Sequence, residues 1–177
     1  LVNSTNGCFQ VADLTQDGVV APASITANTW VHIALSYNSE TNYLSLLEDG
    51  VEVGTYPVTY TPDWNPQSNI WWVGAESDAD TASDTVINEW VGEIAEFRVW
   101  DTWHDESSIS CTYDQVLDGA EPNLMTRISF DNDLTDFSGN GFDLVAYDGA
   151  GFATGSLGLT TAPFDSLTCF DYDDDGS

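Results

Sequence analysis

The C-terminal residues carry acids at a spacing that suits a divalent cation. Residues 171–176 read DYDDDG, which places carboxylates on alternate positions and ends in a glycine. Carboxylate oxygens on alternate residues can converge on one hard cation, and glycine permits the sharp turn that brings them together. The pattern predicts a Ca2+ site with the ligands Asp171, Asp173 and Asp175. A solvated acidic tail without metal is the alternative explanation.

A second candidate calcium site lies in a turn rich in short, oxygen-bearing side chains. Its predicted ligands are Asp131, Asp133, Asp136 and Asn140, with Ser138 between the last two. Such side chains can wrap around a cation, but they can equally accept hydrogen bonds from their own backbone as Asx-turns. Metal binding and turn capping therefore both remain open at this turn.

Aromatic residues suggest a different kind of site. The chain has seven Trp and seven Tyr among 177 residues. Neighbouring residues of a strand project to opposite faces, so the adjacent Trp71 and Trp72 should point to opposite sides of their predicted strand. An exposed Trp beside Asp or Asn can stack on a sugar ring while polar neighbours bind its hydroxyl groups. We predict that carbohydrate binds at Trp64, Trp71, Trp72 and Trp103. For each of these rings, packing in the core is the alternative.

The net charge restricts the possible partners. The chain has thirty acidic residues, two arginines (Arg98 and Arg127) and no lysine, which gives a formal net charge of −28 at pH 7. Nucleic acids and anionic membranes both require basic patches, so we exclude them as partners. A chain of this charge repels itself unless cations screen it. Adaptation to high salt and specific calcium binding would both explain the composition.

The cysteines indicate disulfides rather than a zinc site. Cys8, Cys111 and Cys169 are widely spaced and form no C-x-x-C pair. Such spacing is typical of structural disulfides, although connectivity cannot be deduced from sequence. Our first choice is a Cys111–Cys169 bond, which leaves Cys8 either unpaired or paired with a missing segment or another chain.

The elements that must position these residues are predicted to be strands. In residues 29–37, Val31, Ile33, Leu35 and Tyr37 alternate with other residues, so one face of this strand should be buried. A second strand at 43–48 ends at Asp49-Gly50, a dipeptide that suits a tight hairpin turn. Alternation and turn residues predict further strands at 8–12, 51–60, 70–74, 89–100, 124–130 and 142–147. The one helical pattern spans 105–118, with Ser107 or Ser108 as its cap.

Two of these segments resemble a known family. Residues 29–50, TWVHIALSYNSETNYLSLLEDG, are similar to the core strands and Asp-Gly hairpin of laminin G-like and pentraxin-like jelly rolls. Residues 92–100, GEIAEFRVW, resemble the late strand of the same family, within the concanavalin A-like lectin/glucanase superfamily. The resemblance implies an all-β, antiparallel β-sandwich jelly roll with at most one short helix. It leaves the ligand open, because this fold carries many functions.

The resemblance also suggests the domain limits. We expect a laminin G-like sandwich over residues 1–150 and a C-terminal extension with the acidic tail over 151–177. Family members usually carry several strands before the Trp-His segment, and these are missing here or supplied by another segment. We therefore expect a portion of a larger secreted or cell-surface protein, whose open sheet edges pair with other copies or neighbouring domains.

The first functional hypothesis is a non-catalytic, calcium-stabilised adhesion or structural module of an extracellular surface or filament protein. The alternative is a calcium-dependent carbohydrate-binding module that recognises glycans. A glycoside hydrolase is the third possibility, since hydrolases of this superfold carry paired carboxylates on one strand. Glu93 and Glu96 are three positions apart and should project to opposite faces, so we expect no enzyme activity. Glu96 and Arg98 should instead share a face and form an ion pair.

Overall fold

The computed structural model of the chain describes residues 2–4, 26, 28–58, 72–77, 86–87, 90–147 and 149–153. Its elements, in chain order, are β1 (Val2–Ser4), β2 (Ile33–Asn38), β3 (Tyr43–Glu48), β4 (Val51–Pro57), β5 (Glu76–Ser77), β6 (Val86–Ile87), β7 (Gly92–Ile94), β8 (Phe97–Trp100), α1 (Glu106–Thr112) and β9 (Leu124–Ile128). The predicted strand at 8–12 lies outside the described residues. No helix among the described residues has the length and apolar character needed to cross a membrane.

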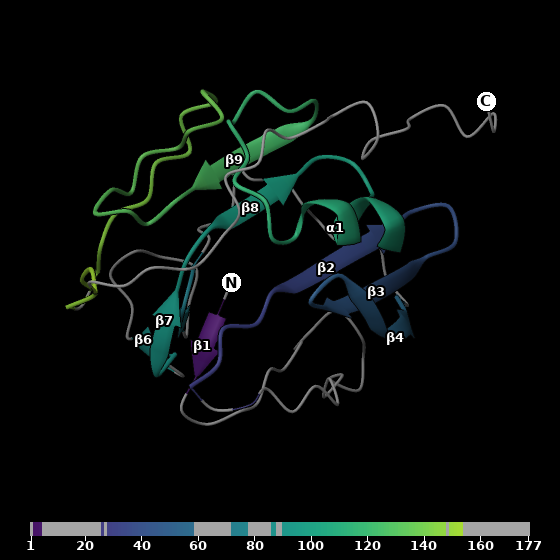
Figure 1. The fold of residues 1–177 in the computed structure, drawn as a ribbon, viewed down its shortest axis with the longest axis horizontal. Helices are drawn as coiled ribbons and strands as arrows, with labels where there is room; N and C mark the ends of the chain where they lie inside the picture. The colour runs from purple at the N-terminus through teal and green to yellow at the C-terminus, as the bar shows by residue number, and fades with distance from the viewer. Residues whose placement is uncertain are drawn as a thin grey trace.

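All described strand pairs are antiparallel. Strands β2, β3 and β4 form a meander, while β1 pairs with β7, β5 with β6, and β8 with β9. Figure 1 shows the β8–β9 pair on one side of α1 and the β2–β3–β4 sheet on the other. The arrangement confirms the predicted all-β class with one short helix, consistent with a β-sandwich.

The Asp49-Gly50 turn forms the predicted tight hairpin between β3 and β4. Asp49 has a φ of 48° and Gly50 a φ of 78°, and Glu48 pairs directly with Val51 across the turn. Two positive φ angles are typical of the two-residue turns whose twist matches antiparallel strands. A Cβ atom at Gly50 would meet Ser110 and Tyr113, so the tip of this hairpin packs closely against α1 and its C-terminal end.

The alternation in β2 assigns Leu35 to the buried face, and this prediction is wrong. Leu35, expected in the core, is exposed, whereas Ser36 on the opposite face is buried. The hydroxyl of Ser36 donates a hydrogen bond to the backbone carbonyl of His104 and accepts one from its N–H. The segment before α1 therefore covers the face that the alternation assigned to solvent. The largest fully buried side chains are Leu44, Leu46, Leu47, Leu117 and Ile128.

The late strand predicted at 89–100 is interrupted. Strand β7 ends at Ile94 and pairs with β1, whereas β8 begins at Phe97 and pairs with β9. Between them Glu96 has a φ of 59°, in the left-handed region that non-glycine residues rarely adopt. This local bend lets one run of sequence leave one strand pair and enter another.

Three further predicted elements differ from the structure. Residues 72–74, the described part of the strand predicted at 70–74, form no strand. Residues 142–147 form no strand, and this segment is tethered by a hydrogen bond from Leu144 N to Leu134 O. Helix α1 is shorter than predicted and is capped by Asp105, which accepts from Ser108 N, rather than by Ser107 or Ser108. An aspartate one residue before the first helical position provides the better cap because its carboxylate accepts from the free N–H groups of the first turn.

Candidate functional site

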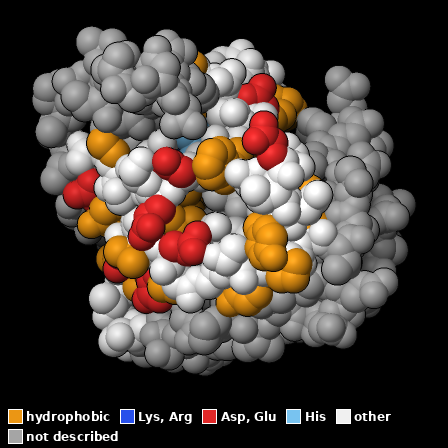
Figure 2. Space-filling model, turned by 90° about the vertical axis from the view of Figure 1, so that its right-hand side faces the viewer, with side chains coloured by type: hydrophobic (Ala, Val, Ile, Leu, Met, Phe, Trp, Pro, Cys, Tyr) orange, Lys and Arg blue, Asp and Glu red, His pale blue; other side chains and the backbone are white. Residues whose placement is uncertain are grey.

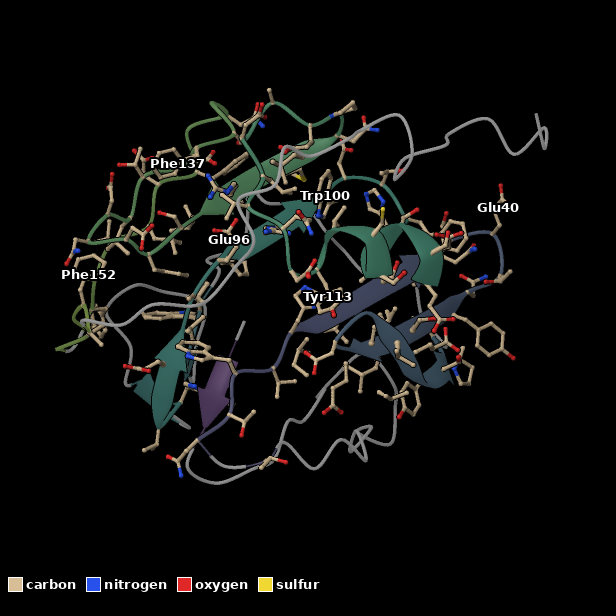
Figure 3. All side chains as sticks on the ribbon, in the orientation of Figure 1. Glu40, Glu96, Trp100, Tyr113, Phe137 and Phe152 are labelled. Atoms are coloured by element: carbon tan, nitrogen blue, oxygen red, sulfur yellow. The ribbon has the colours of Figure 1, made fainter. Side chains whose placement is uncertain are left out.

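Both arginines of the chain converge on one carboxylate, that of Glu96. Arg127 contacts it with two nitrogens, at 2.7 Å from Nε to Oε1 and 3.1 Å from Nη2 to Oε2. Arg98 Nε lies 3.1 Å from the same Oε1, which confirms the ion pair predicted for Glu96 and Arg98. All three side chains are largely buried. Figure 3 shows Glu96 at the junction of β7 and β8.

Arg98 connects this ion cluster to the end of α1. Its guanidinium donates hydrogen bonds to the backbone carbonyls of Thr112 and Gln115. The last turn of a helix leaves carbonyl oxygens without intrahelical partners and favours positive charge. No basic residue lies in the last turn of α1 itself, so Arg98 supplies that charge from β8.

Arg127 connects the cluster to the turn that follows β9. Its backbone N–H donates to Asp136 Oδ1 at 3.0 Å, and its carbonyl accepts from Phe137 N at 2.8 Å. The guanidinium carbon lies 5.4 Å from the centre of the Phe137 ring, a cation–π distance. The cluster thereby fixes the beginning of the 136–142 turn.

Asp136, predicted as a calcium ligand, is saturated by hydrogen bonds. Its Oδ1 accepts from the N–H groups of Arg127 and Ser138, and its Oδ2 accepts from Phe142 N and the Ser138 hydroxyl. Burial opposes ionisation of this carboxyl, but the four donors outweigh it and lower its pKa from 3.8 to about 2. Asp136 therefore stays charged near neutral pH and acts as the anchor of the turn.

The other predicted ligands in this turn also bond to their surroundings. Asp133 accepts from the N–H and hydroxyl of Thr135, and the amide of Asn140 donates to the carbonyls of Leu124 and Met125. Asp131 is exposed. Within the described ranges, no three His, Cys, Asp or Glu side chains are grouped so as to hold a metal ion. The structure therefore supports the turn-capping alternative here and does not bring the four residues together as a calcium site.

The Asp136 turn also positions an aromatic pair on the surface. Asp136 N donates to Asp143 Oδ1 at 2.8 Å, which ties the turn to the segment that carries Tyr147. The Tyr147 ring meets Trp72 edge to face, with centroids 5.4 Å apart and planes at 80°. Tyr147 is 45% exposed and Trp72 is half-buried. The Trp72–Tyr147 pair therefore presents aromatic surface to solvent.

Trp72 is held by a turn of its own. Gly74 accepts a hydrogen bond from Trp90 N at 2.7 Å and has a φ of 83°. A Cβ atom at Gly74 would lie 3.1 Å from the side chain of Ile94 in β7. The turn after Trp72 thus packs against the strand that precedes Glu96, which joins the aromatic pair to the ion cluster from a second direction.

The remaining predicted site residues are dispersed or lie outside the described part of the chain. Trp103 is 48% exposed and lies between β8 and α1, away in sequence from the Trp72–Tyr147 pair. Cys111 is disulfide-bonded, while the choice of Cys169 as its partner stays a prediction. The predicted site residues that lie outside the described ranges are Trp64, Trp71, Cys8, Cys169, Asp171, Asp173 and Asp175.

Neither histidine carries a charge near neutral pH. Burial is the main reason that the pKa of His32 falls from 6.5 to about 3. Burial also lowers the pKa of His104, whose ring contacts Trp100 with centroids 4.7 Å apart. Since the two arginines are enclosed with Glu96, no basic side chain of this chain contributes positive charge to its surface.

Sequence reasoning missed two residues that organise the site. Arg127 lies 31 positions from Glu96, so no local period could have paired them. The sequence pattern places Tyr147 in a strand, whereas its contact with Trp72 arises from a segment without regular structure. The scarcity of basic residues is the signal that could have predicted the Glu96–Arg127 pair. A buried acid needs a basic partner, and this chain offers few candidates.

The chain belongs to the concanavalin A-like lectin/glucanase superfamily: a family model of laminin G-like type with this description matches residues 1–110. No curated protein matches the sequence. A solved structure of a candidate carbohydrate-binding protein from Bacteroides ovatus is similar over 79% of this chain and 48% of its own, with a TM-score of 0.60 and 14% identity. An S-layer domain-containing protein from Clostridium thermocellum has a TM-score of 0.41 and 19% identity, over 52% of this chain and 43% of its own.

These comparisons confirm the family and fold expected from the two sequence motifs. The chain spans about half the length of the Bacteroides ovatus protein it resembles. The predicted domain limits of 1–150 and 151–177 stay a prediction.

We predict that Glu96→Gln destabilises the fold by about 3–5 kcal/mol, because removing one partner of a buried ion cluster leaves the others uncompensated. Urea unfolding followed by tryptophan fluorescence would measure the change. Glu93→Gln is the matched control, since Glu93 is exposed on β7 and should change stability by less than about 0.5 kcal/mol. Equal effects of the two substitutions would contradict the role assigned to Glu96.

A second prediction concerns acid stability. Because the pKa of Asp136 is lowered to about 2 in the folded state, from 3.8, its contribution is present above pH 4 and is lost as pH falls from 4 to 2. Asp136→Asn should therefore be less stable at neutral pH and lose less further stability over that acid range. The test is to measure the free energy of unfolding across these pH values for wild type, Asp136→Asn and Glu93→Gln. Parallel curves for all three proteins would refute the anchoring role.

Proposed function

We propose that this domain is a non-catalytic, lectin-like module that binds carbohydrate through exposed aromatic side chains. The observation that carries the proposal is the Trp72–Tyr147 pair, which joins two distant segments and leaves Tyr147 open to solvent. Aromatic rings offer sugars a flat apolar surface, and convergent polar groups give direction to the contact. Membership of a lectin/glucanase superfamily and the likeness to a candidate carbohydrate-binding protein support the same ligand class.

The positions of the acids support a non-catalytic role. Retaining and inverting glycosidases both need two carboxylates facing one another across the scissile bond. Here Glu93 is exposed on β7, while Glu96 is enclosed by Arg98 and Arg127 beyond a backbone bend. A carboxylate held by two guanidinium groups is poorly placed to serve as nucleophile or to donate a proton.

We further propose an extracellular or cell-surface location. The disulfide at Cys111 supports an oxidising compartment, since such bonds are rare in reducing cytosol. The strongly acidic composition favours partners other than nucleic acids and anionic membranes. Glycans displayed outside the cell are compatible with both observations.

The prediction for carbohydrate binding is site-specific. Screening on an array of animal, plant and bacterial glycans should find a ligand, and Trp72→Ala or Tyr147→Ala should weaken it at least about tenfold by removing the stacking surface. Calorimetric titration with the strongest array ligand would measure this. Trp103→Ala, another exposed Trp, is the matched control. A blank array, or a loss confined to Trp103→Ala, would contradict the site proposed.

A second candidate function is adhesion or assembly with calcium as the bridging cation. It is favoured by the absence of any basic side chain from the surface, because two copies of the chain can approach only if added cations neutralise their carboxylates. The acidic tail, with Asp171, Asp173 and Asp175, is the proposed calcium site. The hydrogen-bonded turn at Asp136 is left out of this proposal.

Calcium should raise the melting temperature if this candidate is correct. A ligand that binds only the folded state adds about 2.7 kcal/mol at a hundredfold excess over its Kd. Differential scanning fluorimetry would compare CaCl2, EDTA, and EDTA with NaCl at molar concentration. Asp171→Asn combined with Asp173→Asn should reduce the calcium shift, with Glu93→Gln as control. If NaCl stabilises as well as calcium, the acids reflect general salt adaptation.

A further inference from the structure

The structure accounts for every side chain that could give this protein a positive charge. The sequence has two arginines, two histidines and no lysine, and Arg98, Arg127, His32 and His104 all lie among the described residues. The side chains of Arg98 and Arg127 are only 10% and 9% exposed, and both contact Glu96. Burial lowers the pKa of both histidines, so they are neutral near pH 7. The surface therefore has no basic side chain with which an anionic ligand could pair.

Arg127 contacts the segment that leads to Tyr147, but its charge is already engaged. Nε and Nη2 of its guanidinium contact the two carboxylate oxygens of Glu96. Its guanidinium carbon lies 5.4 Å from the centre of the Phe137 ring, which is itself partly exposed. This cation therefore supports an aromatic ring from the protein side and is not available to a ligand at the surface.

The segment that carries the Tyr147 ring presents a carboxylate in place of a cation. Asp143, four residues before Tyr147, is exposed, and its Oδ1 accepts a hydrogen bond from Asp136 N at 2.8 Å. The same imbalance appears elsewhere on the surface. Figure 2 views one side of the molecule, where the coloured side chains include red carboxylates and no blue Lys or Arg. A negatively charged ligand would therefore meet like charges that no basic side chain offsets.

Uncharged sugars avoid this repulsion. The polar groups of Trp72 and Tyr147 are an indole N–H and a phenol hydroxyl, which can bind sugar hydroxyls without a charge. Their rings can stack on the apolar faces of sugars. An acidic sugar could make the same contacts, but its carboxylate or sulfate would lose hydration and gain no ion pair in return. Charge therefore separates the two classes of sugar at this site, whereas ring stacking does not.

We propose that the Trp72–Tyr147 pair binds uncharged sugars and discriminates against acidic ones, so that the ligand is a glycan of neutral hexoses or N-acetylhexosamines. Uronic acids, sialic acids and sulfated sugars form the excluded class. The determinant of this specificity is an acidic surface in which all basic side chains are buried. The inference rests on the proposed carbohydrate-binding function and adds the chemical class of its ligand.

The test is a glycan array in EDTA, in which each neutral glycan is printed beside partners that carry sialic acid, a uronic acid or sulfate. At about 20 mM NaCl the acidic partners should bind at least about tenfold more weakly than the neutral glycan. The difference should shrink to less than about threefold at about 500 mM NaCl, because salt screens repulsion between exposed charges.

The array separates failure of this inference from failure of the proposed function. An acidic glycan that binds as tightly as its neutral partner at low salt would overturn the inference and leave carbohydrate binding in place. A difference that salt does not change would indicate steric exclusion and would also overturn it. An array without any bound glycan would refute the proposed function and the inference together.

A matched pair of variants tests whether charge at this segment selects the ligand. Val145, two residues before Tyr147, is 88% exposed, and Val51 on β4 is 58% exposed, so a lysine fits at either position. Figure 1 shows β4 and the segment that contains Val145 on opposite sides of the molecule. Val145→Lys should strengthen binding of the acidic partner at least about threefold at low salt, and Val51→Lys less than about 1.5-fold.

Calorimetric titration of both variants with one neutral glycan and its acidic partner from the array would measure these changes. Affinity for the neutral glycan should stay within about twofold of wild type in both variants, which shows that the aromatic pair is intact. If Val145→Lys strengthens binding of the acidic partner no more than Val51→Lys does, the local absence of positive charge does not determine specificity and the inference is refuted.

Discussion

The enclosure of Glu96 by Arg98 and Arg127 connects parts of this fold that are distant in sequence. Through Arg98 it reaches the carbonyls at the end of α1, and through Arg127 it reaches the turn anchored by Asp136. Withdrawing three charged groups from water is costly, and the cost is offset only while the pairing geometry is complete. The left-handed backbone of Glu96 adds a further local cost. The cluster therefore acts as a single unit whose parts depend on one another.

Because both arginines pair with the buried Glu96, they affect which charges the surface presents to other molecules. The chain has no lysine and both arginines are buried, so the acidic side chains on the described surface have no basic side chains to pair with. Ion pairs between copies are thereby disfavoured, and interactions through charge depend on mobile cations or on a basic partner. Exposed aromatic and aliphatic groups become more important, since they can bind neutral ligands such as sugars without adding charge.

The aromatic pair illustrates how the ion cluster supports a surface feature from below. Arg127 holds Asp136, Asp136 is linked to Asp143, and the segment that follows carries Tyr147 to Trp72. On the other side, the turn after Trp72 packs on β7, immediately before Glu96. Since residues 142–147 form no strand, hydrogen bonds from side chains take over the positioning that a sheet would otherwise provide. This arrangement adds a chain-specific feature to a fold that the superfamily shares.

The sequence by itself determined the class of fold, because strand alternation and the Asp49-Gly50 turn are local properties that a few neighbouring residues specify. It also predicted the Glu96–Arg98 pair, whose members are two positions apart, although Glu96 lies in the bend between β7 and β8 and not on a strand. Only the tertiary structure decided that Arg127 joins them, that Ser36 rather than Leu35 is buried, and that Asp136 caps a turn. The first two depend on segments far apart in the chain, whose contacts are set by the packing of whole elements and leave no periodic trace in the sequence. The third was one of two local alternatives, and the donors that Asp136 meets, including Arg127 N, decided it.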